Sequence, residues 1–173
     1  MKKIISAGTT LALLVAAGSA FAENSLNAGT LGLNVAVSGG GPLLPFGAPQ
    51  MITGKDFIAK DMAVLAGFGM NNTSGTGGGT AWGIMGGIRK YLKTEDFAPF
   101  VGGRLSYGSD GASSATTGLG IGVEAGAEYF LAKHFSLEGS VGFGINIYTP
   151  PSPAASVTNL GTTSAGLSAN FYF

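Results

Sequence analysis

Residues 161–173 alternate between bulky apolar residues and small or polar residues. Read back from the end, one set includes Phe173, Phe171 and Leu167, and the residues between are tyrosine, asparagine, serine and glycine. A repeat of two places its sets on opposite faces of a β-strand, so this segment predicts a strand and not a helix. A strand ending on aromatic rings is typical of a membrane barrel, whose rings lie at the bilayer interface.

Seven further segments show this alternation and predict strands. They are residues 28–38, 51–58, 62–70, 80–92, 97–108, 118–130 and 135–148. From residue 118 to 129, for example, one face carries leucine, isoleucine, valine, alanine and tyrosine, and the other carries only glycine and glutamate. The segment 51–58 has the least regular pattern. With the closing segment, the predicted number of strands is eight.

The connections between these segments alternate in length. The first, third, fifth and seventh are long and rich in glycine, proline, serine or threonine, whereas the others are short and charged. Outer-membrane barrels have an even number of strands, short periplasmic turns and long extracellular loops. The sequence therefore predicts an all-β fold, an eight-stranded antiparallel up-and-down transmembrane β-barrel with both termini periplasmic.

The face that points outward separates a membrane barrel from a soluble one. A soluble lipocalin-type barrel also has about eight alternating strands, with its apolar face turned inward. Here the other face consists of glycine, serine, asparagine and a few charges, too small and polar for a soluble core. It fits the narrow interior of an eight-stranded barrel, which leaves the apolar face to the lipid. The aromatic residues near strand ends are then predicted to form interfacial belts: Trp82, Tyr91, Phe97, Tyr107, Tyr129, Phe135 and Tyr148.

Several charged residues fall on the inward face of their predicted strands: Arg89, Arg104, Glu124, Glu128 and Glu138. In lipid at mid-depth an arginine would cost about 2–4 kcal/mol, so we expect these side chains inside, where they can pair. Lys55 and Asp56 are adjacent, so one of them faces outward unless a β-bulge or a frayed strand intervenes. We expect Lys55 inside. The network is predicted to plug the lumen, and a charge-selective path or gate is the alternative.

The first 22 residues have the features of a bacterial secretory signal peptide. Lys2 and Lys3 precede an apolar run at residues 11–17, and Ala20-Phe21-Ala22 fits the cleavage pattern. The run is too short for a membrane helix, which needs about 20 apolar residues. We therefore expect residues 1–22 to be cleaved, residues 23–173 to form the barrel domain, and the protein to reach the outer membrane.

Composition limits the chemistry. The chain has no cysteine, and its 9 Lys and Arg balance 9 Asp and Glu, so neither thiol chemistry nor nucleic-acid binding is expected. No cofactor motif or metal-ligand cluster appears. His134, Ser136 and Glu138 are the residue types of the hydrolytic triad of outer-membrane lipid A deacylases, but they fall at the end predicted to be periplasmic, away from lipid A. We expect no enzymatic activity, with a lipid A-modifying hydrolase as a remote alternative.

A family resemblance rests on the signal peptide, the eight strands and three sequence features: Arg89-Lys90-Tyr91-Leu92, the run from Phe97 to Gly103, and the terminal Phe173. The mature chain resembles small outer-membrane β-barrel proteins of the OmpX, OmpA-barrel and surface-antigen kind. The resemblance implies that the barrel-assembly machinery reads Phe173, Phe171 and Leu167. It also implies a structural or surface-interaction role, or a narrow channel for small or apolar solutes. The partners expected are outer-membrane lipid and that machinery; the sequence identifies no extracellular partner.

Overall fold

The computed structural model describes residues 26–38, 51–75, 78–112, 114–162 and 166–173, and all of its regular structure is β-strand. The strands are β1 (Leu31–Ser38), β2 (Ile52–Ala59), β3 (Met62–Thr73), β4 (Gly79–Tyr91), β5 (Phe97–Ser109), β6 (Thr117–Ala132), β7 (Phe135–Thr149), β8 (Val157–Thr162) and β9 (Gly166–Tyr172). Every pairing is antiparallel, which confirms the predicted all-β antiparallel class. The predicted signal peptide lies outside the described residues.

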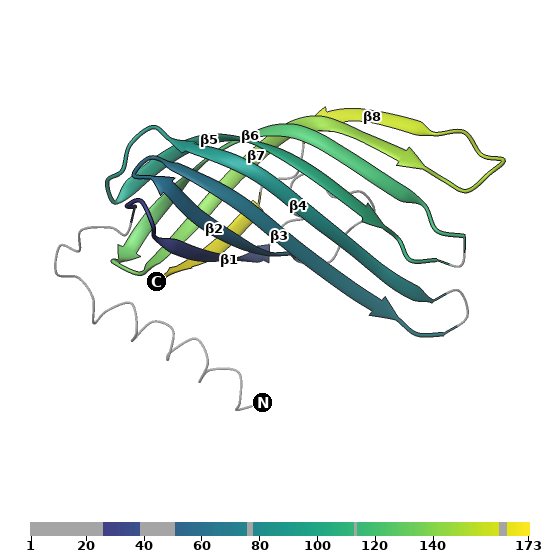
Figure 1. The fold of residues 1–173 in the computed structure, drawn as a ribbon, viewed down its shortest axis with the longest axis horizontal. Coiled ribbons are helices and arrows are strands. Elements are labelled where there is room, and N and C mark those ends of the chain that lie inside the picture. The colour runs from purple at the N-terminus through teal and green to yellow at the C-terminus, as the bar shows by residue number, and fades with distance from the viewer. Residues whose placement is uncertain (1–25, 39–50, 76–77, 113, 163–165) are drawn as a thin grey trace, which may run out of the picture.

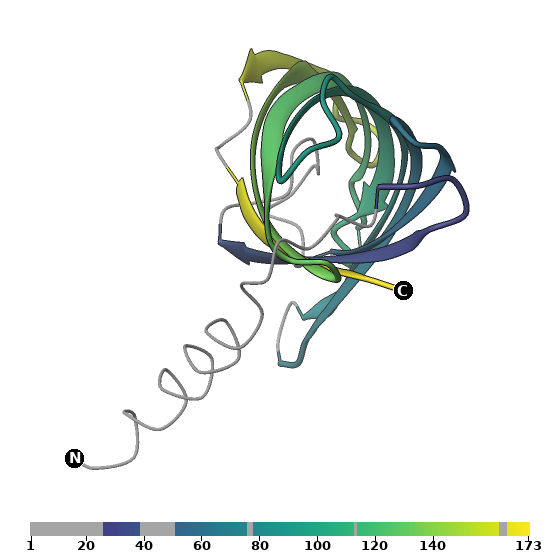
Figure 2. The same ribbon diagram turned by 90° about the vertical axis from the view of Figure 1, so that its left-hand side faces the viewer.

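The strands form one sheet that closes on itself. Its order is β6-β5-β4-β3-β2-β1-β9-β7-β8, and an additional pairing of β6 with β7 completes the ring. The first half of β7 pairs with β9, and its second half pairs with β8. β8 and β9 therefore share one position, and the nine strands occupy the eight predicted places around the ring (Figure 2).

The structure corrects several predicted strand limits. The closing segment was predicted at 161–173, but its pairing with β7 begins at Val157, in what was predicted to be a loop. This extension has a simple reason: β7 continues to Thr149, and Tyr148 lies opposite Val157. Conversely, the first strand begins at Leu31, because residues 28 and 29 form a turn, in which the Gly29 nitrogen donates to the Phe57 carbonyl oxygen. Within the described ranges, no helix is long and apolar enough to cross a membrane.

The ring has a short-turn end, which carries the connections at residues 60–61, 92–96 and 133–134. The described chain begins and ends there as well, as Figure 1 shows for the carboxyl terminus. Leu26 belongs to the same buried apolar cluster as Phe57 and Tyr172, and the Phe173 nitrogen donates to the Leu31 carbonyl oxygen at 2.9 Å. The longer connections lie at the other end of the strands.

The two faces of the ring differ as the alternation predicts. In β4, Ile84 and Ile88 are about half exposed on the outward face, whereas Arg89 and Tyr91 are buried in the interior, the lumen. Glycine allows the narrow bore. A Cβ on Gly126 would lie 2.3 Å from the Gly139 carbonyl oxygen and 2.6 Å from the Phe100 ring. Such contacts exclude any larger residue unless the backbone shifts.

Lys55 and Asp56 occupy opposite faces of β2. Lys55 is buried in the lumen, and Asp56 is exposed on the outward face. The register with β3 is regular here, with Lys55 opposite Leu65 and Asp56 opposite Val64, and it shifts only beyond Phe57. The strand therefore resolves the adjacent charges by turning Asp56 outward, without the bulge or fraying considered for this position.

Candidate functional site

The six predicted lumen charges form one cluster, which we call the ionic layer: Lys55, Arg89, Arg104, Glu124, Glu128 and Glu138. Arg89 lies at its centre. It donates to Glu138 through Nη1 and Nη2, both at 2.9 Å, and through Nη2 to Glu124 at 3.0 Å. The Lys55 ammonium bridges Glu138, at 2.8 Å, and Glu128. Three positive and three negative charges thus cancel inside the ring.

Arg104 forms the edge of the ionic layer nearer the long connections. Its Nη2 lies 2.5 Å from Glu124 Oε2, and its side chain is 11% exposed. The Arg104 Nε atom is buried without a hydrogen-bond partner among the described residues, as is Asn146 Oδ1. On this side of the layer, one buried hydrogen-bond donor and one buried acceptor therefore lack a partner among the described residues.

Neutral polar groups surround the carboxylates. Tyr91 donates to Glu128 at 2.6 Å, Ser136 donates to Glu128 at 3.0 Å, and the Tyr172 hydroxyl donates to Glu128 as well. Asn34 donates to Glu138 at 3.3 Å and to Asn170 at 2.7 Å. These hydrogen bonds to the carboxylates matter because an unpaired buried charge costs several kcal/mol.

An apolar layer closes the short-turn end below the charges. It consists of Leu26, Phe57, Ala63, Tyr91, Ala98, Phe100, Phe130 and Tyr172. The Arg89 guanidinium lies 3.6 Å from the centroid of the Phe100 ring, so the two layers are in direct contact. A smaller apolar cluster of Met51, Leu65 and Met85 is buried elsewhere in the lumen.

The structure corrects the predicted aromatic belts at two positions. Tyr91 is only 2% exposed and points into the lumen, because it shares the face of Arg89. Tyr148 has the register of the inward-facing Asn146 and lies opposite Gly118, so it also belongs to the lumen side. Parity along the strands predicts both placements. The same rule identifies Tyr172, which was not among the predicted lumen residues, because it shares the inward face of Asn170.

The remaining belt residues lie on the outward face near strand ends. Phe97 is opposite Tyr129, and the rings of Phe135 and Phe171 are 5.2 Å apart at the short-turn end. At the other end, the rings of Trp82 and Tyr107 are 5.8 Å apart. The predicted assembly residues are outward too, with Leu167, Phe171 and Phe173 58%, 43% and 78% exposed.

The residues considered for a hydrolytic triad make other contacts in the structure. Ser136 is fully buried, donates its hydroxyl proton to Glu128 and accepts a hydrogen bond from Asn170. Glu138 binds Lys55 and Arg89. His134 is exposed in the turn between β6 and β7. The hydroxyl proton is committed to a carboxylate, so the arrangement lacks the serine–imidazole bond that a hydrolytic triad needs. In the described parts of the chain, no group of His, Cys, Asp and Glu side chains is placed to hold a metal ion.

No family model matches the sequence. No curated protein matches it either. The chain is similar in structure to the N-terminal β-barrel domain of Pseudomonas aeruginosa OprF, with 15% identity and a TM-score of 0.49, covering 84% of this chain and 98% of that chain. At this identity and TM-score, we draw neither family membership nor function from the similarity.

Proposed function

We propose that the protein is an integral outer-membrane β-barrel whose outward face contacts lipid. The observation that supports this proposal is that large apolar side chains face outward and charged side chains face inward, the reverse of a soluble protein. Large apolar side chains such as Phe68, Ile121 and Val123 are more than half exposed outside, while Glu128, Arg89 and Lys55 are buried inside. Exposed apolar surface of this extent marks a contact with lipid or protein. Here it covers the outward faces of successive strands around the ring, as a lipid-facing surface does.

The aromatic side chains support an orientation. Phe97, Tyr129, Phe135 and Phe171 form a belt at the short-turn end, and Trp82 and Tyr107 lie at the other end. Two such belts are typical of membrane barrels, with short turns in the periplasm and long loops outside. We therefore propose that the short-turn end faces the periplasm. We also propose that the barrel-assembly machinery recognises β9 and Phe173, which follows it.

The proposed role is structural or surface-interacting, with a sealed lumen and no catalysis. The ionic layer and the apolar layer lie one above the other in the bore, and both are buried. A solute would have to break a charge-neutral network and then displace the packed rings of Phe100, Tyr91 and Tyr172. Among the described residues, the exposed connection at residues 151–156, at the opposite end, is available to an extracellular partner.

A narrow channel is the second candidate. The unpaired Arg104 Nε and Asn146 Oδ1 favour it, because buried polar atoms of this kind are usually satisfied by water. The two proposals differ in planar-bilayer conductance of the purified protein. The sealed-lumen proposal predicts no discrete openings. Openings that disappear on replacing Glu124 by Gln or Arg104 by Gln would overturn it in favour of the channel.

A further inference from the structure

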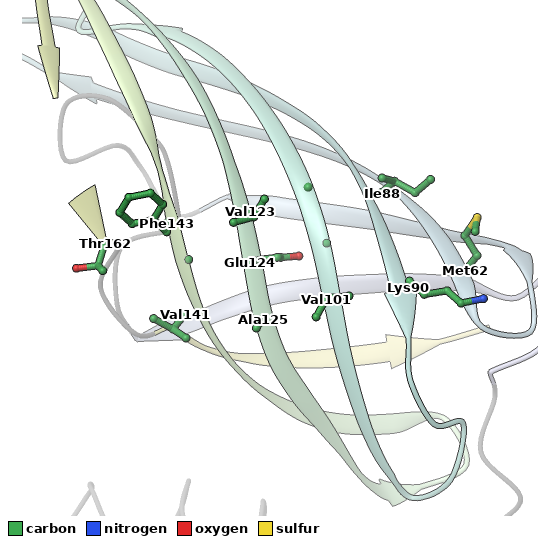
Figure 3. Close-up of a pocket in the computed structure, with 13 residues that line it drawn as sticks. Met62, Ile88, Lys90, Val101, Val123, Glu124, Ala125, Val141, Phe143 and Thr162 are labelled. Carbon is green, nitrogen blue, oxygen red and sulfur yellow. The ribbon is translucent and has the colours of Figure 1, made fainter. Parts of the chain in front are cut away.

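The outward face of the ring contains an open, shallow hollow of about 710 Å³ across β3 to β8 (Figure 3). Its lining is almost wholly apolar and includes Ile88, Val123, Phe143, Gly103 and Ala125. Its volume lies within the range of about 300–1,000 Å³ that is usual for small-molecule sites. In Figure 3 the labelled side chains follow the sheet from Met62 and Lys90 at one end to Phe143 and Thr162 at the other.

The hollow arises from small residues among large ones. Gly103 lies between Ile88 and Val123 across the sheet, and Ala125 lies between Val101 and Val141. The glycine position is open, since a Cβ there would approach nothing closer than the Gly122 carbonyl oxygen at 3.9 Å. The close approach that excludes a Cβ at Gly126 is absent at Gly103. A side chain at position 103 would extend into the hollow.

Lys90 gives the hollow a polar end. The other charged residue of the lining, Glu124, turns its carboxylate inward to Arg89 and Arg104, so Lys90 is the outward-facing charge of the site. In the described strands, Lys90 and Asp56 are the charged side chains on the outward face. Lys90 is next to the last residue of β4, at the short-turn end.

Asp61 stands beside Lys90 in the turn between β2 and β3. The Lys90 ammonium donates to its carboxylate, and both side chains are nearly half exposed. This hydrogen bond lowers the pKa of Asp61, whose carboxylate is ionised at neutral pH. The site thus offers an exposed cation and anion next to an apolar trough. An exposed ion pair of this kind is weak and can share its charges with a ligand.

The geometry points to a phospholipid site: one zwitterionic phospholipid of the leaflet at the short-turn end, of the phosphatidylethanolamine class, occupies this hollow. Its acyl chain lies over Gly103 and Ala125, its phosphate accepts from Lys90, and its ammonium donates to Asp61. The head group and the ion pair carry complementary charges, and the apolar trough matches the chain. The inference rests on the proposed membrane location.

The test uses the mature protein in non-ionic detergent micelles, titrated with phosphatidylethanolamine and observed by native mass spectrometry. Wild-type protein is expected to retain one lipid. Gly103→Leu, which fills the floor, is expected to lose it. Gly86→Leu is the matched control, because Gly86 is an open outward position whose Cβ would meet nothing closer than 4.0 Å and does not line the hollow. It should bind like wild type.

The head-group contacts have their own variants. Lys90→Gln should raise the Kd for phosphatidylethanolamine about tenfold, the size expected for one lost charge-assisted hydrogen bond. Phosphatidylcholine, which has the same charges but no ammonium N–H, should bind more weakly to wild type. Asp61→Asn should remove this difference between the two lipids.

Three results would overturn the lipid site. These are equal binding by Gly103→Leu and wild type, equal loss in Gly86→Leu, and a dimer without lipid, which would assign the hollow to a second copy. Insertion into vesicles and heat-modifiable gel migration are recorded for every variant. A protein that inserts but retains no lipid contradicts the lipid site alone. A protein that never inserts contradicts the membrane proposal and the lipid site with it.

Discussion

Arg89 and Glu138 are joined across the lumen by two parallel hydrogen bonds, each 2.9 Å long. The residues belong to β4 and β7, which do not pair with each other in the sheet. The bidentate pair therefore spans the interior and fixes the distance between two separate parts of the wall. This geometry is the strong form of the arginine–carboxylate bond, and here it is fully buried.

Replacing Glu138 by Gln should lower the free energy of unfolding by about 3–5 kcal/mol, because Arg89 and Lys55 then share fewer carboxylates in a buried site. Urea-induced unfolding of protein in lipid vesicles measures this. The double variant Arg89→Met with Glu138→Gln removes one charge of each sign. It should recover most of the loss. A double variant as unstable as the single one would show that charge balance does not govern the layer.

Gly126→Ala should impair folding, since its Cβ would lie 2.3 Å from the Gly139 carbonyl oxygen. We expect a loss of about 1–3 kcal/mol from overpacking. Gly139→Ala is the control, because its Cβ would meet only Leu167 at 3.8 Å. The folded fraction is read from heat-modifiable migration on a gel. Equal folding of the two variants would contradict the close approach at Gly126.

Tyr91→Phe should lower the free energy of unfolding by about 1–3 kcal/mol, because Glu128 loses a buried donor. Tyr129→Phe changes a 54% exposed ring on the outward face and should stay within about 0.5 kcal/mol of wild type. Denaturant titrations of both variants decide the point. Equal effects of the two substitutions would contradict the placement of Tyr91 in the lumen and favour its predicted place in the interfacial belt.

Deletion of Phe173 should reduce insertion into the outer membrane far more than its packing suggests. The residue is 78% exposed, and its described contact is the backbone bond to Leu31. Phe97→Ala removes a ring from the same end and serves as the control. The quantity measured is the folded fraction in cell envelopes. Normal insertion without Phe173 would refute its role as an assembly signal.

Alternation along the strands predicted the ring and its charged interior. Within each of the strands β4 to β7, alternation holds at the charged residues, so the face of each could be assigned from the sequence. The parity also placed Tyr91 and Tyr148 inside, but their aromatic character suggested a belt instead. Their hydroxyl groups make inward burial possible, since Tyr91 finds a carboxylate partner there.

Other features depend on contacts that the sequence does not contain. The start of β8 at Val157 is set by the length of β7, and the residue pattern of neither strand predicts it. The burial of Leu26 at the short-turn end depends on a turn at Gly29, which has a φ of 85°. In this turn the Gly29 nitrogen donates to the Phe57 carbonyl oxygen. The hollow at Gly103 likewise depends on neighbours from separate strands.

The most direct test of the membrane proposal is the environment of the outward face. Because the chain has no cysteine, single-cysteine variants can each carry one nitroxide label. In lipid vesicles, a label at Ile121 should collide more with oxygen, which concentrates in lipid, than with a water-soluble nickel complex. A label at Lys133, exposed in the turn between β6 and β7, should show the reverse. A label at Ile121 that favours the nickel complex would place this face in water and contradict the account.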